Sequence, residues 1–399
     1  MNNNNSKSLQ SRLFNTFLII LLVRTGTYIP VPNVDQEYLK NILYSIPLLR
    51  NFYTNENLVL GIFSLGILPY INASIMIQLL VSIIPSLEKL QKEEGERGRK
   101  KIIEYTRYLT LVWAIIDSVS IAVALRPILF VQSFTIFSQI IITLITGSMI
   151  VLWLSDLITE NGLGNGSSII ITLNILSTFP KTIKTVIDIS NPTSAAVNFF
   201  TFSLLIICVI YVQEAVRIIP LISAKQLTSN FGNNSKNSYL PLKINQSGIM
   251  PIIFASTILT VINLLINYLV GLNILPNFFT NVEFQSILFR ILNFVLIIAF
   301  SLFYSNLILN PKELAKDLNK MAVTIPGVRP GNQTSEFLQN MLKRLTLIGA
   351  LFLAITVTVP KVNAYGFGVT SLLILVGVTL ETSRQIQTLL ISESYKTYI

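Results

Sequence analysis

Ten apolar runs of about 20 residues restrict the fold of this chain more than any other feature of its sequence. Each run is long enough to cross a hydrocarbon core of ~30 Å as a helix. In lipid every backbone polar group must be paired internally, so only helices and closed barrels can cross. Barrel strands would alternate over about ten residues, whereas these runs are apolar on all sides. The predicted membrane-spanning helices are 12–30, 68–87, 107–126, 133–155, 167–187, 197–219, 248–272, 286–309, 344–360 and 368–387.

The composition also favours a membrane protein and argues against an enzyme. Of 399 residues, 52% are hydrophobic and 12% are charged, whereas soluble domains carry about 25% charged residues. There is no histidine, and the single cysteine, Cys208, excludes an intramolecular disulfide. These absences remove histidine-based triads and imidazole metal ligands, so we expect no catalysis, cofactor or metal. The net charge of +10 lies between the spans, and we expect no DNA binding.

The distribution of Lys and Arg predicts the orientation of the chain. If the ten spans alternate in direction, positive charge concentrates in segments on the same side as the N-terminus, above all 88–106, 220–247 and 310–343. The positive-inside rule then places both termini on the cytoplasmic or stromal side. The cations outside this pattern are Arg24, Lys40, Arg50, Arg126, Lys181, Lys184, Arg290 and Lys361.

A nine-residue pattern, G-I-x-P-x-I-x-A-S, occurs at 66–74 and again 182 residues later at 248–256. The two copies open spans two and seven, which run in opposite directions. Five spans per half is an odd number, so two related halves must be inverted with respect to each other. We therefore predict halves 1–190 and 191–399, related by an axis in the membrane plane, with a site at their interface.

A short apolar segment, 58–65, precedes the second span and is too short to cross the membrane. Gly66 and Pro69 separate it from the long helix. A short helix broken from a long one is tolerated at membrane depth only where it packs in protein or lines a cavity. Two interpretations stay open at this point: a helix that merely packs, and a mobile stopper.

Several motifs, in the same order along the chain, resemble those of the SecY family of protein-conducting channels. They are LGILPYINASIMIQLL (65–80), EGERGRKKIIEYTRY (94–108), GNGSSIII (164–171), QEAVRIIP (213–220), LPLKINQSGIMPIIFAS (240–256), NPKELAKDLNKMAVTIPGVRPGNQT (310–334), RLT (344–346) and FGVTSLL (367–373). The resemblance covers nearly all of residues 12–395. It implies an all-α membrane protein whose ten transmembrane helices form two inverted five-helix halves around a central pore. The implied function is to pass unfolded polypeptides across the membrane and to release apolar segments sideways into lipid.

The resemblance also assigns residues to the pore. A ring of aliphatic side chains excludes water and ions by dewetting and offers a passing polypeptide no specific contacts. Three members lie on one helical stripe of span two. The predicted ring is Ile67, Ile71, Ile75, Ile171, Ile253 and Ile374, and Ser167 stands where the family often has a further isoleucine. The predicted plug, which closes the pore from the outer side, comprises Leu58, Leu60, Ile62 and Phe63. The predicted lateral gate between spans two and seven comprises Asn72, Ser74, Gln78, Ser256 and Thr260.

The two long loops, 220–247 and 310–343, are where the resemblance implies that partners dock. Arg329 lies in the sequence Gly-Val-Arg-Pro-Gly, which fixes a tight turn and exposes one guanidinium. Arg217 and Lys243 complete the predicted docking set. The first loop holds only three lysines, so we expect weak phosphate neutralisation on ribosomal RNA. The implied partners are a SecE-like small membrane subunit, a SecG-like subunit, the SecA motor ATPase, the ribosome or signal recognition particle pathway, translocating polypeptides and membrane lipid.

The main alternative is an inverted-repeat secondary transporter of a small solute, because inverted repeats and broken helices suit that class too. A transporter needs polar ligands at the midplane, whereas the repeated helices here present isoleucines. The glycine-rich segment 162–166 has no preceding strand, which argues against a phosphate loop. We expect it to begin span five, with Asn165 or Ser167 as the helix cap. The lean loops resemble algal plastid forms, which implies the thylakoid membrane; a bacterial inner membrane is the alternative.

Overall fold

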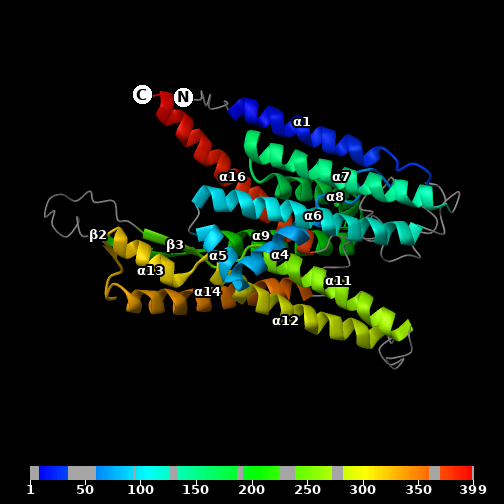
Figure 1. Cartoon of the computed structure of the whole chain (residues 1–399). Helices are drawn as coiled ribbons and strands as arrows, with labels where there is room; N and C mark the ends of the chain where they lie inside the picture. The colour runs from blue at the N-terminus through cyan, green and yellow to red at the C-terminus, as the bar shows by residue number, and fades with distance from the viewer. Residues whose placement is uncertain are drawn as a thin grey trace, which may run out of the picture. The chain divides into compact units, whose positions relative to one another are not determined.

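The computed structural model describes residues 9–34, 60–92, 95–125, 133–186, 192–223, 239–271, 282–358 and 369–397 (Figure 1). In these residues the chain is mostly helical, with short strands in two antiparallel pairs. The chain divides into two compact units, and each is described by itself. Unit 1 comprises Met1–Ile183 and Val378–Ile399, and unit 2 comprises Lys184–Gly377.

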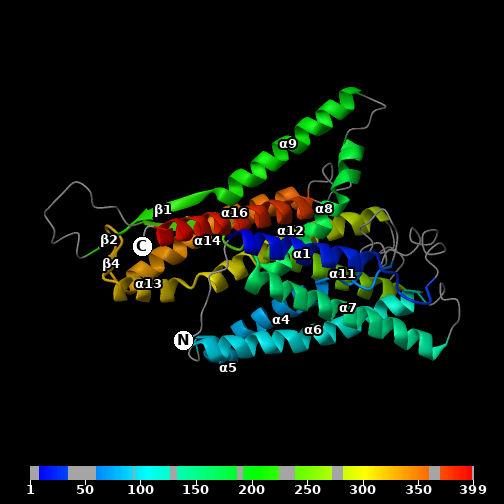
Figure 2. The same ribbon diagram turned by 90° about the horizontal axis from the view of Figure 1, so that it is seen from above.

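Unit 1 is a helical bundle in which α6 makes the most extensive helix–helix contacts. Its helices are α1 (Leu9–Tyr28), α4 (Leu68–Ile83), α5 (Pro85–Lys92), α6 (Gly95–Leu125), α7 (Phe134–Asn161), most of α8 (Gly166–Val186) and the larger part of α16 (Val369–Thr397). The apolar helix α7 packs against α1 and α6, and both α4 and α5 pack against α6 (Figure 2). The gate-helix candidate α4 is therefore held mainly through α6.

The segment before α4 packs among the ends of α1, α6 and α7 in unit 1. Leu60 and Leu65 are fully buried there, in an apolar core with Ile121 and Leu125 of α6 and Leu144 of α7. Backbone hydrogen bonds join this segment to the residues that follow α1: Val31 N–H donates to Leu60 O (2.8 Å), and Ile62 N–H donates to Ile29 O (2.9 Å).

The expectation of a short helix in this segment is wrong for residues 60–66. Two turns replace it, in which Ser64 N–H donates to Gly61 O and Gly66 N–H donates to Phe63 O. The reason is that the segment pairs with the chain after α1, through a bridge between Pro30 and Gly61. A backbone that makes this long-range pairing cannot also make the local hydrogen bonds of a helix.

Unit 2 is a second bundle, built on α12. Its helices are α9 (Pro192–Glu214), α11 (Met250–Gly271), α12 (Val282–Ile308), α13 (Pro311–Lys320), α14 (Asn332–Thr358) and residues 369–377 of α16. The central helix α12 packs against α11 and α14, and α13 lies against α14 (Figure 1). A buried hydrogen bond between the hydroxyls of Ser305 and Thr346, 2.6 Å long, joins α12 to α14.

The two long loops of the sequence come together in unit 2. Strand β1 (Val216–Pro220) pairs antiparallel with β3 (Tyr239–Lys243), and β2 (Ile222–Ser223) pairs antiparallel with β4 (Val323–Thr324). They also share an apolar core, whose buried members are Ile219, Leu242, Leu318, Ile325, Leu338 and Leu342. We call this assembly of strands, α13 and the start of α14 the loop cluster.

Each predicted span overlaps a helix, but several boundaries differ. The second span, 68–87, is divided between α4, which ends at Ile83, and α5, which begins at Pro85. The sixth helix ends at Glu214 rather than 219, because residues 216–220 pair with β3. The third, ninth and tenth helices continue through charged residues to Gly95, Asn332 and Thr397. Among the described helices, α6, α7, α12 with α13, and α14 are long and apolar enough to cross a membrane, and α4, α8, α9 and α11 contain shorter apolar stretches.

Candidate pore and docking surfaces

The two copies of the repeated motif adopt the same local conformation. Gly66 and Gly248 both have positive φ, 55° and 63°. In each copy the helix begins two residues later, and a proline occupies its second position, where the missing N–H costs no helical hydrogen bond. No atom lies within 4 Å of where a Cβ on Gly248 would be, so backbone conformation rather than space requires glycine there.

The start of each motif helix faces a later helix of its own unit. In unit 1 a side chain on Gly66 would contact the amide of Asn174 on α8, at 3.7 Å. In unit 2 a side chain on Gly377 of α16 would overlap that of Ile249, the residue before α11. The predicted ring residues Ile171 and Ile374 each lie three positions before these contacts, on the same helical face. Both units therefore place a ring candidate one turn from the start of a motif helix.

The ring candidates differ in burial. Ile67, Ile71 and Ile75 on α4 are 2%, 8% and 5% exposed, respectively. Ile171, Ile253 and Ile374 are half-buried. Four of the six belong to unit 1 and two to unit 2. The closure of these side chains into one ring stays a prediction.

Glycines of two helices in unit 1 lie directly against the plug candidates. Leu60 is fully buried, and Ile62 and Phe63 are half-buried. A Cβ on Gly26 of α1 would overlap the ring of Phe63, and one on Gly147 of α7 would overlap the backbone of Ile62. Leu58 lies outside the described residues.

The gate candidates on α4 do not share one stripe. Ser74 and Gln78 are one turn apart, and the Gln78 amide donates to Ser74 Oγ at 3.4 Å. Asn72 lies on another face, about 160° from Ser74 around the helix. On α11, the Ser256 hydroxyl donates to the carbonyl of Ile253 in its own helix (2.8 Å). The side chain of Thr260 lies outside the described part of the chain.

The turn that carries Arg329 has the predicted geometry. Its flanking residues Gly327 and Gly331 have positive φ, 81° and 106°. Thr334, in the first turn of α14, donates a hydrogen bond from its hydroxyl to Arg329 O (2.8 Å). At the other end the turn is anchored by Ile325, which is buried in the loop cluster. The side chain of Arg329 is left exposed on a well-fixed backbone.

The other two docking candidates lie in the same loop cluster. In the β1–β3 pairing, Arg217 is opposite Leu242 and Lys243 is opposite Val216. Successive side chains of a strand point to opposite faces, so Arg217 and Lys243 lie on opposite faces of this sheet. Arg217 borders an open groove of about 800 Å³, together with Tyr211 of α9. The structure thus brings all three cations onto one packed cluster.

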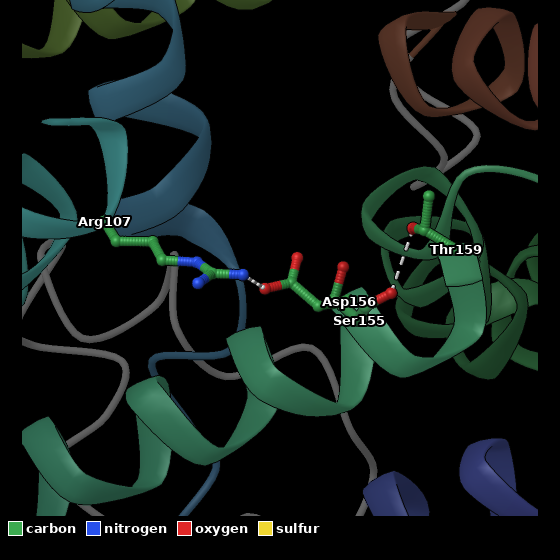
Figure 3. A network of polar contacts seen from close by, with 4 residues as sticks. All are labelled: Arg107, Ser155, Asp156 and Thr159. Carbon is green, nitrogen blue, oxygen red and sulfur yellow. Dashed lines mark hydrogen bonds and ion pairs between the residues drawn. The ribbon is translucent and has the colours of Figure 1, made fainter. Parts of the chain in front are cut away.

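A polar network in unit 1 was missed by the sequence predictions. Arg107 Nη2 of α6 lies 2.7 Å from Asp156 Oδ2 of α7 (Figure 3). One turn later, Thr159 Oγ1 donates to Ser155 O and accepts from Gly166 N–H, each at 3.0 Å. One sequence signal for this pair was available. Arg107 begins span three and Asp156 follows span four, and the alternation of the spans places these two ends on the same side of the membrane. Their charges are opposite.

The start of α8 confirms the predicted helix cap. Asn165 Oδ1 accepts hydrogen bonds from the amide of Ser167 (3.2 Å) and from its hydroxyl (2.8 Å). Gly164 has φ of 76°, which turns the chain into the helix. The glycine-rich segment is therefore a helix entry, as predicted.

The comparison with known proteins decides the family. A profile of the SecY family matches residues 61–383. The protein translocase subunit SecY of Guillardia theta is 44% identical over 410 residues, which cover 98% of this chain and 97% of the relative. The chain belongs to the SecY family. Its relatives also include the SecY subunits of Porphyra purpurea, 43% identical with 97% of each chain covered, and of Synechococcus elongatus, 41% identical with 98% of this chain and 94% of the relative covered.

Solved structures agree with this SecY-family membership at the level of the fold. The structure of a protein-conducting channel matches with a TM-score of 0.70 at 18% identity, covering 96% of this chain and 93% of the other. Sec61 in a canine ribosome–channel complex matches with a TM-score of 0.64 at 17% identity and the same coverage. The protein therefore has the SecY/Sec61 channel fold. The alternative of a small-solute transporter finds no support in these comparisons.

Proposed function

We propose that this SecY-family chain is the central channel-forming subunit of a Sec protein translocase. It passes unfolded polypeptides through a pore and catalyses no reaction itself. Besides membership of the family, one structural observation supports the proposal. The starts of α4 and α11 share a conformation, and each faces a helix that bears a predicted ring isoleucine. Duplicated helix starts of this kind suit two inverted halves of five spans each that meet at a central site.

The seal of the proposed pore is apolar. Ile67, Ile71, Ile75 and Ile171 of unit 1 would meet Ile253 and Ile374 of unit 2, and the plug would close the outer side. The near-complete burial of the three α4 isoleucines supports this assignment, because a closed constriction excludes water from its lining. The plug segment packs at one end of α1 and α6. If the spans alternate in direction, that end is on the outer side of the membrane.

The proposed lateral gate is the seam between α4 and α11. Ser74 and Gln78 on α4 and Ser256 on α11 would border it, with Asn72 and Thr260 as the remaining candidates. Short polar side chains of this kind form weak interhelical hydrogen bonds, worth about 0.6 kcal/mol each in membrane helices. A seam joined only by bonds of this strength would part for an apolar segment at low cost.

The proposed partners dock on the loop cluster. The exposed Arg329, on a backbone fixed by Ile325 and Thr334, would serve the SecA motor, and Arg217 and Lys243 would add charge on the two faces of the β1–β3 sheet. A SecE-like subunit is the expected membrane partner, a SecG-like subunit a further one, and the ribosome or the signal recognition particle pathway a second route. Relatives from Guillardia theta and Synechococcus elongatus support a plastid or cyanobacterial setting. The thylakoid membrane is our proposal within that setting, and the Lys and Arg distribution puts both termini on the stromal side.

Crosslinking of a trapped polypeptide tests the proposal. A translocating chain is stalled in the reconstituted complex, and photoreactive groups are placed at 67, 71 and 75 of α4 and at 253 and 256 of α11. We expect crosslinks from both helices to the polypeptide, and none from the exposed position Phe14 of α1. Crosslinks absent from both helices would refute the channel assignment.

A further inference from the structure

The C-terminal part of α7 contacts two other helices of unit 1, α6 and α8, and α6 in turn packs against α4. Arg107 and Asp156 form a charge-assisted hydrogen bond of 2.7 Å between α6 and α7. Such bonds are about twice as strong as those between neutral groups. Both side chains are partly exposed, 49% and 32%, so solvent or lipid headgroups weaken the pair.

The same pair is linked to the gate-helix candidate α4 through α6. Helix α4 packs chiefly on α6, the helix that carries Arg107. A shift of α6 relative to α7 would therefore move α4 as well.

One turn further along α7, a neutral contact holds α8. The first amide of α8, on Gly166, donates to Thr159 Oγ1, and the Thr159 hydroxyl in turn donates to Ser155 O. A Cβ on Gly166 would overlap the Ser155 carbonyl, so the two backbones are in direct contact. Ile171 lies five residues further along the same helix, so a shift of α8 at this contact would also move Ile171.

We propose that residues 155–159 of α7, with Arg107, form a positioning junction that holds α4 and α8 at the spacing that keeps the pore sealed. We call this set the α7 junction (Figure 3). Its residues do not line the pore. They act through Ile67 and Ile71 on α4 and Ile171 on α8, and the inference therefore rests on the proposed function.

The test measures ion leak through the resting channel in planar bilayers, together with the amount of channel in the membrane. Asp156→Asn should raise the leak about three- to tenfold, because a charged hydrogen-bond partner is lost from a partly exposed site. Asp156→Glu should stay sealed. Exchange of the charges, Arg107→Asp with Asp156→Arg, should recover most of the seal. The matched control is Glu160→Gln, one turn away on the same helix and exposed, which should not leak.

The α8 arm of the junction has its own variants. Thr159→Val removes the acceptor for Gly166 N–H and should leak, whereas Thr159→Ser should not. These neutral changes keep the inference testable if a charge variant fails to accumulate in the membrane.

The outcomes separate the junction from the ring. The junction would be overturned if the Asp156→Asn or the Thr159→Val channel is present at normal levels and does not leak. It would also be overturned if Asp156→Asn leaks and the charge exchange does not reduce that leak. A leak in Ile71→Ser with sealed junction variants would overturn the junction alone. A sealed Ile71→Ser channel would overturn the ring assignment, and with it the route through the ring isoleucines by which the junction is proposed to act.

Discussion

The hydroxyl groups of Ser305 and Thr346 lie 2.6 Å apart and form a buried hydrogen bond between α12 and α14. They are 2% and 3% exposed, so neither can turn to water if its partner is lost. Because α14 begins directly after the Arg329 turn, this bond fixes the helix that supports the proposed docking surface.

Replacement of Thr346 by valine should destabilise the bundle of unit 2. The change keeps the shape of the side chain and leaves Ser305 Oγ without this partner, at a cost of about 0.6 kcal/mol and at most ~2 kcal/mol. Unfolding of the purified protein in mixed detergent micelles measures the loss. Thr356→Val is the control, since Thr356 donates to carbonyls of its own helix. Equal effects of the two changes would contradict the role of the interhelical bond.

Replacement of Ile71 or Ile253 by serine should make the resting pore leak ions. A hydroxyl in an apolar constriction admits water and removes the dewetting that blocks ions. Conductance of reconstituted bilayers measures the leak. Ile77→Ser is a matched control, because Ile77 lies on the same helix, is also 8% exposed and is off the predicted stripe. An unchanged conductance in Ile71→Ser, or an equal leak in both variants, would remove the ring assignment.

Charge reversal at the loop tip should impair export driven by the motor while leaving assembly intact. Arg329→Glu replaces an exposed cation on a rigid turn, and its effect should be a loss of transport rate at normal channel levels. Vesicle import assays with purified motor measure the rate. Lys316→Glu, an equal change of charge at an exposed site on α13, serves as the comparison. Normal export by Arg329→Glu would exclude the docking role.

A cavity in the apolar core of the loop cluster should make both long loops susceptible to protease at the same time. Leu242 on β3 is 2% exposed and packs against residues from both loops. Leu242→Ala should cost about 2–5 kcal/mol in local stability, and limited proteolysis should show new cuts near 220 and near 323. The exposed Tyr239 on the same strand supplies a control, Tyr239→Ala. Cuts confined to the first loop would show that the two loops are independent.

The sequence predicted those features whose causes are local. The second helix begins at 68 in both prediction and structure, because Gly66 and Pro69 act within a few residues of that point. The Asn165 cap of α8 was predicted for the same reason. The apolar runs located the other helices, because the length of a run can be read from the sequence without knowing what the helix packs against. The ring, plug and gate residues were assigned by resemblance to the SecY family, and their roles stay predictions.

Features that depend on distant partners could not be predicted. Residues 216–219 continue an apolar run, which predicts the end of a helix. They belong to a strand instead, because 239–243 lies opposite. The turns before α4 depend on the residues after α1. The Arg107–Asp156 pair joins positions 49 residues apart. Their opposite charges at span ends on one side make a contact possible, but they do not single out this pair among the other charged residues there.

The β2–β4 pairing also has a consequence for biosynthesis. Thr324 Oγ1 donates to Ile222 O across 102 residues of chain. At a synthesis rate of 5–20 residues per second, β2 leaves the ribosome roughly 5–20 s before its partner strand. During that interval the first long loop lacks most of the core that buries Leu242, while α11 and α12 enter the membrane. The first long loop can therefore complete its core only after the chain has been made as far as the start of α14.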